Sequence, residues 1–535
     1  MNALKTGDLA LLVEQVIANA SAAGEDAMVV AGRERVSGPD FAERVERTAA
    51  GLAADGMRAG DVVLFGVRPS VDCFVLSLAC MRVGAVVTFI DPGAGAELFA
   101  RRIEMLQPTW VMAESLIYAA SVPGPLRWYV RRAGMELPNL AKIPARHVRS
   151  GPRIPGFVPR SLSTRKLRRA PITDAARAQL PTTVDPATTS VLVFTSGTTG
   201  DPKGVQHTGG SVVAAMRMMY DYFDASSAST FYAHTAHAFV VAMLHGARTV
   251  VSPLSLTPER IDADLRRHGV THAFMLPIEA WNYANWLERS KRSLPPTLEE
   301  LVLFSAPITA PVLERIHALP GGDTLRIVCA YGMTEMLPVS WIDSREKLAW
   351  SGEGDVVGMP VPGVELQLAE DGELLLRGPN LHRGYLGQEP YEWHHSGDLA
   401  RLDEDGRIVL MGRKKDMIIR GDWNIYPGLY EGTACKINGV GACAFIGVPD
   451  PITGDERVVL FIEPDPTCTA TADELRERVE RGLRNGGTQI DQWALPDEVR
   501  VGELPRSGRS SKIDRLQLRS DARVATIEPI LEGAR

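Results

Sequence analysis

The stretch that decides the fold reads FTSGTTGDPKGVQHT and runs from Phe194 to Thr208. It combines glycines, clustered hydroxyl side chains and one lysine, Lys203, a composition typical of a phosphate-binding loop. It does not fit the pattern G-x-x-x-x-G-K-[ST], because Gly200 follows Gly197 too closely and Gly204 follows the lysine. The apolar residues before it predict a buried strand and those after Thr208 predict a helix. A loop in this position can present backbone N–H groups and hydroxyls to one anion.

The composition is that of a soluble globular protein. Of 535 residues, 45% are hydrophobic and 23% are charged, and 58 basic against 65 acidic residues give a net charge of −7. So mild a balance does not favour nucleic-acid binding, and so long a chain needs at least two domains. The 6 cysteines form no C-x-x-C pair, and the N-terminus lacks the pattern of a secretory signal. We therefore expect a cytoplasmic protein, monomeric or homodimeric, without structural zinc or disulfides.

Strand and helix patterns alternate along most of the chain. Residues 61–67 predict a strand, residues 71–84 predict a helix that ends at a glycine, and residues 85–91 predict a second strand. This order predicts parallel strands in a large, multi-layered α/β domain of mixed sheets and helices. Near Gly412 the sequence becomes rich in charge and glycine, which suits a hinge, and a smaller α+β pattern follows it.

Residues 127–169 differ from the rest of the chain by their charge. They include twelve basic residues and a single acid, Glu136, among frequent prolines and glycines. We expect an irregular surface connector. The same charge makes the segment a candidate for contact with an anionic membrane or an acidic partner.

The decisive stretch resembles a signature of the adenylate-forming superfamily, which contains acyl-CoA synthetases, amino-acid adenylation domains and luciferases. The family loop has the form T-S-G-[ST]-T-G-x-P-K-G, and TSGTTGDPKG matches it throughout. The resemblance implies that this loop cradles the β- and γ-phosphates of ATP and that Lys203 adds a compact positive charge there. The other loop residues implied in ATP binding are Thr195, Ser196, Gly197, Thr198, Thr199 and Gly200.

Two further motifs resemble parts of the same nucleotide site. CAYGMTEMLP, from Cys329 to Pro338, is similar to the family's Y-G-x-T-E element. The resemblance implies that Tyr331 stacks on adenine, that Thr334 touches the α-phosphate and that Glu335 holds Mg²⁺, with Gly332 also in the nucleotide site. Without the resemblance, Glu335 would be interpreted as a carboxylate at the start of a helix. FSAPIT resembles the family's G-A-P turn near adenine, which gives the candidates Ser305, Ala306 and Pro307.

The remaining signatures follow in the family's order. HHSGDLARLDEDGRIVLMGRKKD resembles the T-G-D…G-R-x-[DK]-D element, which implies that Asp398 accepts hydrogen bonds from the ribose hydroxyls with Arg413 nearby. LPRSGRSSKIDRLQLR resembles the C-terminal P-R-[TS]-x-x-G-K-[IV]-x-R element. Its lysine, Lys512, is implied to bridge the substrate carboxylate and the α-phosphate. Serine replaces the usual threonine at 396 and the usual glycine at 511.

The resemblance also implies the domain organisation. Residues 1–414 would form the AMP-binding domain and residues 415–535 a small mobile domain, with the hinge near 413–416 and Lys415 at the hinge position. The family rotates this small domain between two half-reactions: ATP and Mg²⁺ serve the formation of an acyl-adenylate, and a thiol, usually that of coenzyme A, then displaces AMP.

The acid and the acceptor stay open at this point. The segment FYAHTAHAFVVAML lacks the acidic residue that holds an amino group in amino-acid adenylation domains. With residues near Met275 to Trp281 it would form an apolar pocket, so we expect a hydrophobic acid, fatty or polycyclic, with His237 and Phe239 near the pocket. Gly421 and Asp422 fall where the family lines its thiol tunnel, and a glycine is usual at the second position.

Three alternatives to a coenzyme A ligase accompany these observations. AYGMTEMLPV and GAVVTFIDPGAG resemble the β-lactone synthetase branch, which closes a β-hydroxy acid to a lactone through an acyl-adenylate. The carboxylate of Asp422 in the expected tunnel is compatible with that branch, whereas the KIDR ending is that of ordinary ligases. The second alternative is acyl transfer to the pantetheine of a carrier protein, and the third is a nucleotide-binding protein without catalysis.

Overall fold

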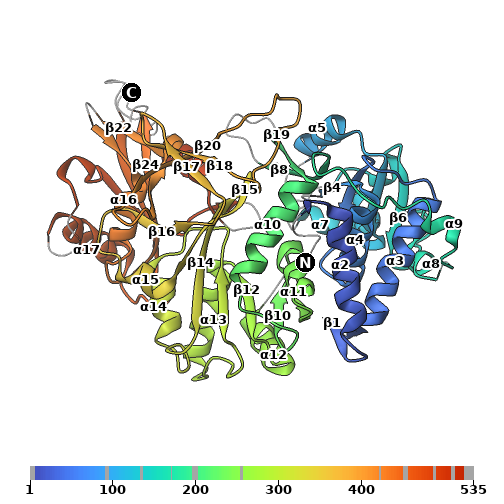
Figure 1. The fold of residues 1–535 in the computed structure, drawn as a ribbon. Helices are drawn as coiled ribbons and strands as arrows, with labels where there is room; N and C mark the ends of the chain where they lie inside the picture. Colours follow the sequence, from blue (N-terminus) through green and yellow to red (C-terminus); the bar gives the residue numbers. More distant parts are fainter. Residues whose placement is uncertain are drawn as a thin grey trace.

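The computed structural model gives the positions of most of the chain. It describes residues 6–90, 96–132, 137–169, 171–195, 203–253, 257–420, 423–449, 456–485, 488, 490–507 and 512–522. Two large sheets with helices around them occupy the first four fifths of the chain, and the C-terminal elements stand to one side of them (Figure 1). None of the helices in the described part has both the length and the apolar composition that crossing a bilayer requires.

The larger sheet has 13 strands and is parallel in its middle, where β11, β10, β12, β13 and β14 are neighbours. Antiparallel strands extend it on the side of β15. In sheet order the strands are β17 (Glu365–Leu368), β18 (Glu373–Arg377), β20 (His394–Leu402), β21 (Ile408–Arg413), β16 (Asp355–Pro360), β15 (Met336–Asp343), β14 (Arg326–Met333), β13 (Glu300–Leu303), β12 (His272–Met275), β10 (Thr230–Ala233), β11 (Arg248–Val251), β1 (Ala27–Ala31) and β2 (Glu34–Ser37).

The second sheet has 8 strands and carries the decisive stretch at one end. Its strands from β8 through β4, β3, β5 and β6 to β7 are parallel, as the sequence predicted for β3 and β4. In sheet order they are β19 (Gly384–Tyr385), β9 (Lys203–Thr208), β8 (Thr189–Thr195), β4 (Val86–Phe89), β3 (Val62–Gly66), β5 (Trp110–Glu114), β6 (Arg146–Ser150) and β7 (Leu162–Ser163).

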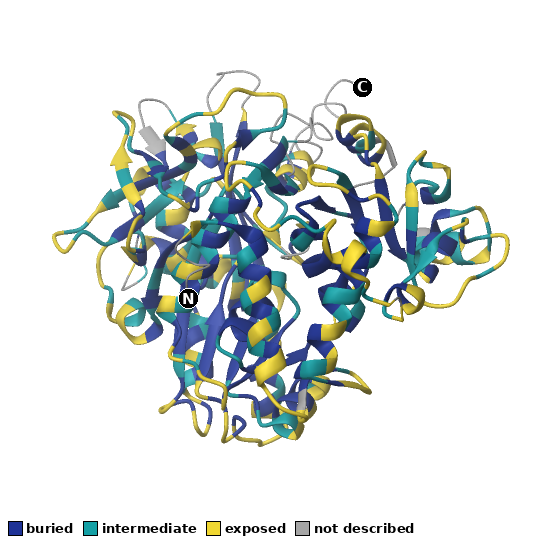
Figure 2. Ribbon diagram, turned by 45° about the vertical axis from the view of Figure 1, so that its right-hand side comes forward, coloured by how far each residue is buried: buried dark blue, intermediate teal, exposed yellow. Residues whose placement is uncertain are grey.

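Helix α4 (Val71–Val83) joins the cores of the two sheets because it is apolar on every side. Val75 and Leu78 belong to the apolar cluster against the larger sheet, whereas Leu76 and Ala79 belong to the cluster against β3 and β5. The helix ends at Gly84, whose φ of 83° is the left-handed conformation that glycine adopts most easily. Figure 2 shows the resulting buried interior beneath an exposed outer surface.

The other helices of this part cover the sheets. They are α2 (Leu9–Ala22), α3 (Gly38–Ala54), α5 (Ala96–Leu106), α6 (Ser115–Ser121), α7 (Pro125–Arg132), α8 (Thr164–Leu167), α9 (Asp174–Arg177), α10 (Gly209–Tyr222), α11 (Ala236–Leu244), α12 (Pro258–His268), α13 (Pro277–Arg289), α14 (Ala310–His317) and α15 (Ser344–Ala349), with a 3₁₀ turn η2 (Leu140–Lys142).

The basic segment is more regular than its composition suggested. The expectation of an irregular connector at 127–169 is wrong, since the segment contains most of α7, the strands β6 and β7, and α8. Strand β6 pairs with β5 in parallel register, Trp110 opposite Arg146. Leu126 and Val130 of α7 pack on the apolar cluster that contains Val111 and Ala113 of β5.

The C-terminal part has a core of its own. Its amphipathic helix α17 (Ala472–Arg484) begins with a capping box between Thr471 and Glu474. Two apolar clusters consist only of residues from Ile418 onward, and among the described clusters none mixes residues from before and after that position. The remaining elements are η3 (Lys414–Asp416), β22 (Ile418–Arg420), β23 (Trp423–Ile425), α16 (Pro427–Ala434), β24 (Val440–Pro449), β25 (Glu456–Pro464), η5 (Gln492–Ala494), β26 (Glu498–Val501), β27 (Arg506–Ser507) and β28 (Lys512–Ile513).

Candidate active site

The phosphate-loop candidate joins two antiparallel neighbours, β8 and β9. Thr195 stands opposite Lys203 in their register, where β8 ends and β9 begins. Ser196, Gly197, Thr198, Thr199 and Gly200 lie outside the described residues. Lys203 opens β9, and its Nζ stands 5.2 Å from the centroid of the Tyr385 ring. The sequence did not predict β9, because only its pairing partners identify it as a strand.

Thr334 and Glu335 form the turn of the β14–β15 hairpin, since Met333 pairs with Met336. The helix-start interpretation of Glu335 is therefore wrong. Tyr385 donates its hydroxyl proton to Glu335 Oε1 at 2.9 Å. A Cβ on Gly332 would lie only 2.8 Å from a methyl carbon of Leu337, so the bulged strand leaves little room for a side chain there.

His207, which the sequence analysis did not single out, supports this turn from β9. Its Nε2 donates to the carbonyl oxygen of Thr334 at 2.7 Å. Burial lowers the pKa of His207, against the opposing effects of that hydrogen bond and of the Glu335 charge. The neutral ring of His207 therefore connects strand β9 to the turn between β14 and β15.

Asp398 is buried and contacts Tyr331 and the exposed side chain of Arg413. Its Oδ2 accepts a hydrogen bond from the Tyr331 hydroxyl at 2.7 Å, and its Oδ1 lies 2.5 Å from Arg413 Nε. Asp398 and Arg413 are direct partners across β20 and β21, which fixes this geometry in the backbone. Burial raises the pKa of Asp398, whose side chain is only 6% exposed, while Arg413 and the phenol act in the opposite direction.

Ser305, Ala306 and Pro307 follow β13, beside the end of β14. The carboxyl ends of neighbouring parallel strands form the edge at which such sheets bind ligands. Ser305 has a φ of 70°, the left-handed region that disfavours residues with a Cβ. The family motif has a glycine at this position, so the serine holds a conformation for which glycine is better suited.

Lys512 comes from the C-terminal part and reaches the same region. It lies on β28 opposite Ser507, with an exposed side chain. Desolvation by nearby protein and the charge of Arg413 lower the pKa of Lys512, although its surface remains accessible to water. The carboxylates of Asp398 and Glu335 are near enough to act on it in the opposite direction. The charges that act on the pKa of Lys512 thus come from both parts of the candidate site.

The two predicted acyl-pocket residues have different surroundings. His237 is the second residue of α11, with its Nε2 3.3 Å from Thr235 Oγ1 and its ring centroid 5.9 Å from that of Phe304. Desolvation lowers the pKa of His237 to about 4, so the ring is neutral near pH 7. Phe239 has no exposed surface and stacks on Phe74 with ring centroids 3.8 Å apart. That location is one of core packing.

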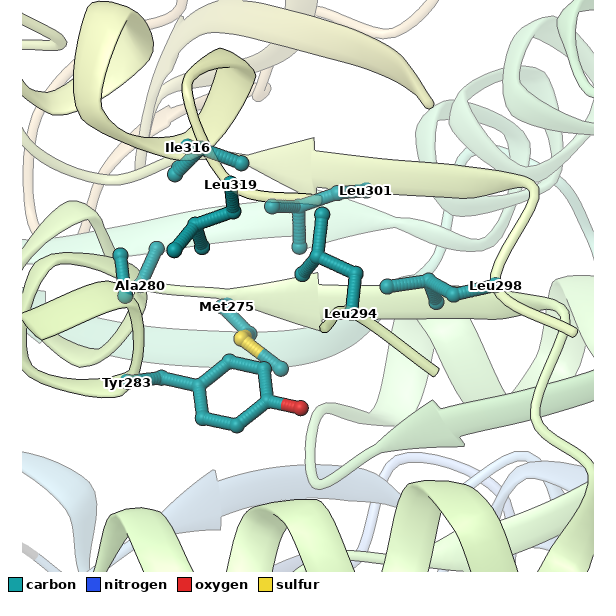
Figure 3. A pocket seen from close by; sticks show the side chains of 9 residues that line it. Met275, Ala280, Tyr283, Leu294, Leu298, Leu301, Ile316 and Leu319 are labelled. Carbon is teal, nitrogen blue, oxygen red and sulfur yellow. The ribbon is translucent and has the colours of Figure 1, made fainter. Parts of the chain in front are cut away.

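Met275 also faces a packed interior. It lines a void of only about 10 Å³ with Tyr283, Leu294 and Leu301 (Figure 3). A void of this size is barely large enough for one water molecule. This void between β12 and α13 has no room for an acid, and the pocket expected near Met275 to Trp281 stays a prediction.

The residues around the expected hinge are anchored on both sides. Lys414 Nζ lies 2.5 Å from Asp371 Oδ2 and 3.0 Å from Glu373 Oε2, next to β18. Asp416 instead lies 3.5 Å from both Arg515 and Arg519 of the C-terminal part. Lys415, between them, is exposed. Gly421 and Asp422, the tunnel candidates, lie outside the described residues.

A cleft of about 600 Å³ separates the two parts beyond this point. It runs between α14 and the loops around 435–440 and 465–470. Arg315 approaches Asp465 across it at 3.9 Å. So long a surface ion pair contributes little to holding the parts together.

Comparison with known proteins identifies the family. The model of the AMP-binding enzyme family matches residues 17–386, and that of the AMP-binding enzyme C-terminal domain matches residues 430–512. The chain belongs to the AMP-binding enzyme family. The prediction of an adenylate-forming enzyme with a large and a small domain is thereby confirmed.

Relatives of this AMP-binding enzyme match over nearly its whole length. It is 26% identical over 523 residues to 3-[(3aS,4S,7aS)-7a-methyl-1,5-dioxo-octahydro-1H-inden-4-yl]propanoyl:CoA ligase of Rhodococcus jostii, covering 93% of this chain and 96% of the relative. It is 27% identical over 506 residues to feruloyl-CoA synthase of an Amycolatopsis species, covering 89% and 91%. The amide bond synthetase McbA of Marinactinospora thermotolerans shares the fold with a TM-score of 0.76, at 21% identity and 96% and 99% coverage.

The chemistry of the site fits one magnesium ion carried with ATP. Mg²⁺ in nucleotide sites is usually held by one or two carboxylates together with phosphate oxygens and water. Glu335 supplies such a carboxylate, and no group of three or more potential metal ligands occurs among the described residues. Glu335 would hold the ion, with the remaining ligands coming from ATP and water.

Proposed function

We propose that this AMP-binding enzyme is an acid–thiol ligase that activates a hydrophobic carboxylic acid with ATP and transfers the acyl group to coenzyme A. The convergence of Lys203, Glu335, Asp398 and Lys512 carries the proposal, because four distant segments supply complementary groups to one region. The relatives support the reaction class, since they are ligases that form coenzyme A thioesters.

In the first step, the carboxylate of the acid attacks the α-phosphorus of ATP and pyrophosphate leaves. Lys203 and the hydroxyl-rich loop would hold the leaving phosphates, and Asp398 would accept hydrogen bonds from the ribose. Lys512 would face the developing charge where carboxylate and α-phosphate meet, an interaction strongest in the transition state. Magnesium, when bound, supplies positive charge to the phosphate oxygens.

In the second step, the thiol attacks the carbonyl carbon of the acyl-adenylate and AMP leaves. A mixed anhydride is a good acyl donor, so the enzyme needs to admit the thiol and withdraw Lys512 rather than add a new nucleophile. We propose that residues 1–414 and 415–535 are the two domains and that rotation about Lys415 exchanges the two steps. The anchoring of Lys414 to one part and Asp416 to the other supports a pivot between them.

The experiment for the main proposal is a panel of acids with ATP, with and without coenzyme A, read by mass spectrometry and by pyrophosphate release. A ligase forms AMP, pyrophosphate and one thioester in equal amounts. Pyrophosphate release with a lactone product that does not depend on coenzyme A would instead establish the β-lactone alternative. Adenylate that is discharged only by a pantetheine-bearing carrier protein would establish transfer to a carrier. Absence of pyrophosphate with every acid would contradict the catalytic proposal.

The hinge proposal has its own variant. Lys415→Pro restricts φ at the pivot, so adenylate formation should persist while thioester formation slows and bound acyl-adenylate accumulates. Glu404→Pro, at the second position of the exposed turn between β20 and β21, is the matched control. Equal slowing of both steps by Lys415→Pro would contradict a pivot at this residue.

We further propose that the face of α6 and α7 contacts an anionic membrane. Trp128 and Tyr129 of α7 are 60% and 67% exposed, and Leu116 of α6 is 53% exposed. Arg132 lies over the Trp128 ring at 4.3 Å. Aromatic rings with neighbouring arginines suit the headgroup region of a bilayer.

Further basic side chains of the same segment are available to anionic lipid. Lys142, Arg153 and Arg160 are exposed, and the structure records no carboxylate within ion-pair distance of them among the described residues. A hydrophobic acid partitions into membranes, so such contact would place the enzyme near its substrate.

Vesicle sedimentation tests the membrane proposal. We expect binding to phosphatidylserine-containing vesicles that falls steeply with salt, and no binding to phosphatidylcholine vesicles. Trp128→Ser with Tyr129→Ser should abolish it, whereas Trp493→Ser, at a partly exposed tryptophan of the small domain, should not. Equal binding to both vesicle types, or to neither, would contradict the proposal.

A further inference from the structure

Tyr385 lies between the two charged groups that are expected to face the ATP phosphates. Its hydroxyl donates to Glu335 Oε1 at 2.9 Å, and Lys203 Nζ stands 5.2 Å from the centroid of its ring. One side chain therefore contacts both the expected magnesium ligand and the expected phosphate lysine. A residue that only filled space would need neither the oriented hydroxyl nor the cation over its ring.

The backbone around Tyr385 ties the same two elements together. Tyr385 pairs with Val205 of β9, and the amide of Leu386 donates to the carbonyl of Gly204 at 2.7 Å. The amide of His382 donates to the carbonyl of Glu335 at 2.9 Å. Residues 382–386 thus connect the strand that begins at Lys203 with the turn that carries Glu335, so Tyr385 has a fixed position relative to both.

Two uncharged rings, those of His382 and Tyr391, pack beside the ring of Tyr385. The rings of His382 and Tyr391 lie 5.1 Å and 6.3 Å from its own, centroid to centroid. Tyr391 bonds His382 Nε2 at 2.5 Å and His394 Nδ1 at 3.1 Å. Burial lowers the pKa of His382 to about 3, so this support adds no charge near Glu335 at neutral pH.

We propose that Tyr385 is a positioning residue that orients Glu335 toward the metal carried by ATP and holds Lys203 toward the phosphates. The proposal rests on the proposed function for the identity of the nucleotide. The hydroxyl occupies one oxygen of Glu335 and restricts rotation of the carboxylate, which leaves the other oxygen directed for coordination. The ring restricts the flexible lysine stem, whose freedom would otherwise be lost on each binding event.

The first experiment measures binding and needs no acid substrate. Thermal unfolding is followed with ATP and EDTA, and with ATP and increasing magnesium. Tyr385→Phe keeps the ring under Lys203 and removes the hydroxyl. We expect an unchanged shift with ATP and EDTA, and about a tenfold higher magnesium concentration for the half-maximal additional shift, since a hydrogen bond to a charged group is lost.

A double-mutant cycle separates positioning from structural support. In a Glu335→Gln background the charge on which Tyr385 acts is already absent, so adding Tyr385→Phe should change the magnesium dependence less than twofold. Tyr430→Phe is the matched control, because it removes a similar phenol–carboxylate bond, 2.8 Å to Asp491, in the C-terminal part. That control should leave the magnesium dependence unchanged.

The outcomes are distinct. Equal magnesium dependence in the wild type and Tyr385→Phe would overturn the proposal, as would the same tenfold effect in both backgrounds. If Tyr385→Phe is poorly folded, Tyr385→Leu removes the hydroxyl as well, and a wild-type magnesium dependence in folded Tyr385→Leu would also overturn the proposal. Binding of ATP and magnesium without adenylate formation from any acid would contradict the proposed function while leaving this test valid.

Discussion

The two ends of the candidate site are built differently. At the nucleoside end, Asp398 is buried and both of its oxygens have partners within the chain, the Tyr331 hydroxyl and the Arg413 guanidinium. At the phosphate end, Glu335 is half-buried and its one side-chain partner among the described residues is the Tyr385 hydroxyl.

This difference indicates which of the two carboxylates is already held in a fixed orientation before ATP binds. A buried carboxylate with two partners keeps its orientation, because rotation away from either partner would leave a buried charge unpaired, which is unfavourable. A carboxylate with one neutral partner keeps coordination capacity for a cation. We therefore propose that the protein alone organises the nucleoside end, whereas ATP and its metal complete the phosphate end.

The largest expected effect comes from Lys512, which lies within electrostatic range of both ends. Lys512→Ala should lower adenylate formation about 10²–10³-fold, the usual loss for one oriented group in the transition state. Supplied acyl-adenylate should still be converted to thioester at nearly the wild-type rate. Stopped-flow measurement of the two half-reactions checks this. Equal damage to both, in a variant whose circular dichroism is unchanged, would show that Lys512 does not serve one step alone.

The next largest effect is expected from Glu335→Gln, which tests the metal ligand at the phosphate end. Glu335→Gln keeps an oxygen that can accept from Tyr385 but removes the charge, so adenylate formation at limiting magnesium should fall tenfold or more. Saturating magnesium should recover part of the loss. Pyrophosphate release across a magnesium titration measures this, and an unchanged magnesium dependence would exclude Glu335 as the metal ligand.

The nucleoside end should respond in a different quantity. Asp398→Asn weakens the bond to Arg413 and removes an acceptor for ribose, so the KM for ATP should rise about tenfold while the magnesium dependence stays the same. Steady-state kinetics at several magnesium concentrations distinguish the two ends. If Asp398→Asn changed the magnesium dependence as Glu335→Gln does, the two ends would not be separate, since the two carboxylates would then act as one unit.

The smallest effect concerns Ser305, at its φ of 70°. Ser305→Gly relieves the conformational cost of a Cβ in this region but adds freedom to the unfolded chain, so we expect stabilisation by up to about 1 kcal/mol. Lys291→Gly, at a φ of 53° after α13, is the matched control and should give a similar gain. Chemical denaturation measures both. A change in ATP affinity confined to Ser305→Gly would support contact with the nucleotide, and loss of stability in both variants would contradict the strain argument.

Much of the fold followed from the sequence because its elements are local. The helix at 71–84 and the strands on either side of it have periodic apolar residues and a glycine at the helix end, and the structure contains them with bounds shifted by one or two residues. The motif TSGTTGDPKG, with YGMTE and SGD behind it, was specific enough to indicate the family before any contact was known, and the family models confirm it.

What only the tertiary structure decided depends on contacts between distant residues. Strand β9 exists because β8 and β19 flank it, and residues 127–169 are partly regular because β6 pairs with β5. Phe239 is placed in the core by Phe74, which no local pattern indicates. Tyr385 reaches Glu335 across 50 residues of sequence, and Tyr331 reaches Asp398 across 67. The sequence by itself determined which chemical groups are present and which segments are helix or strand, since backbone periodicity is local. Which groups meet was decided by sheet order and register, because packing joins segments whose separation along the chain leaves no periodic trace.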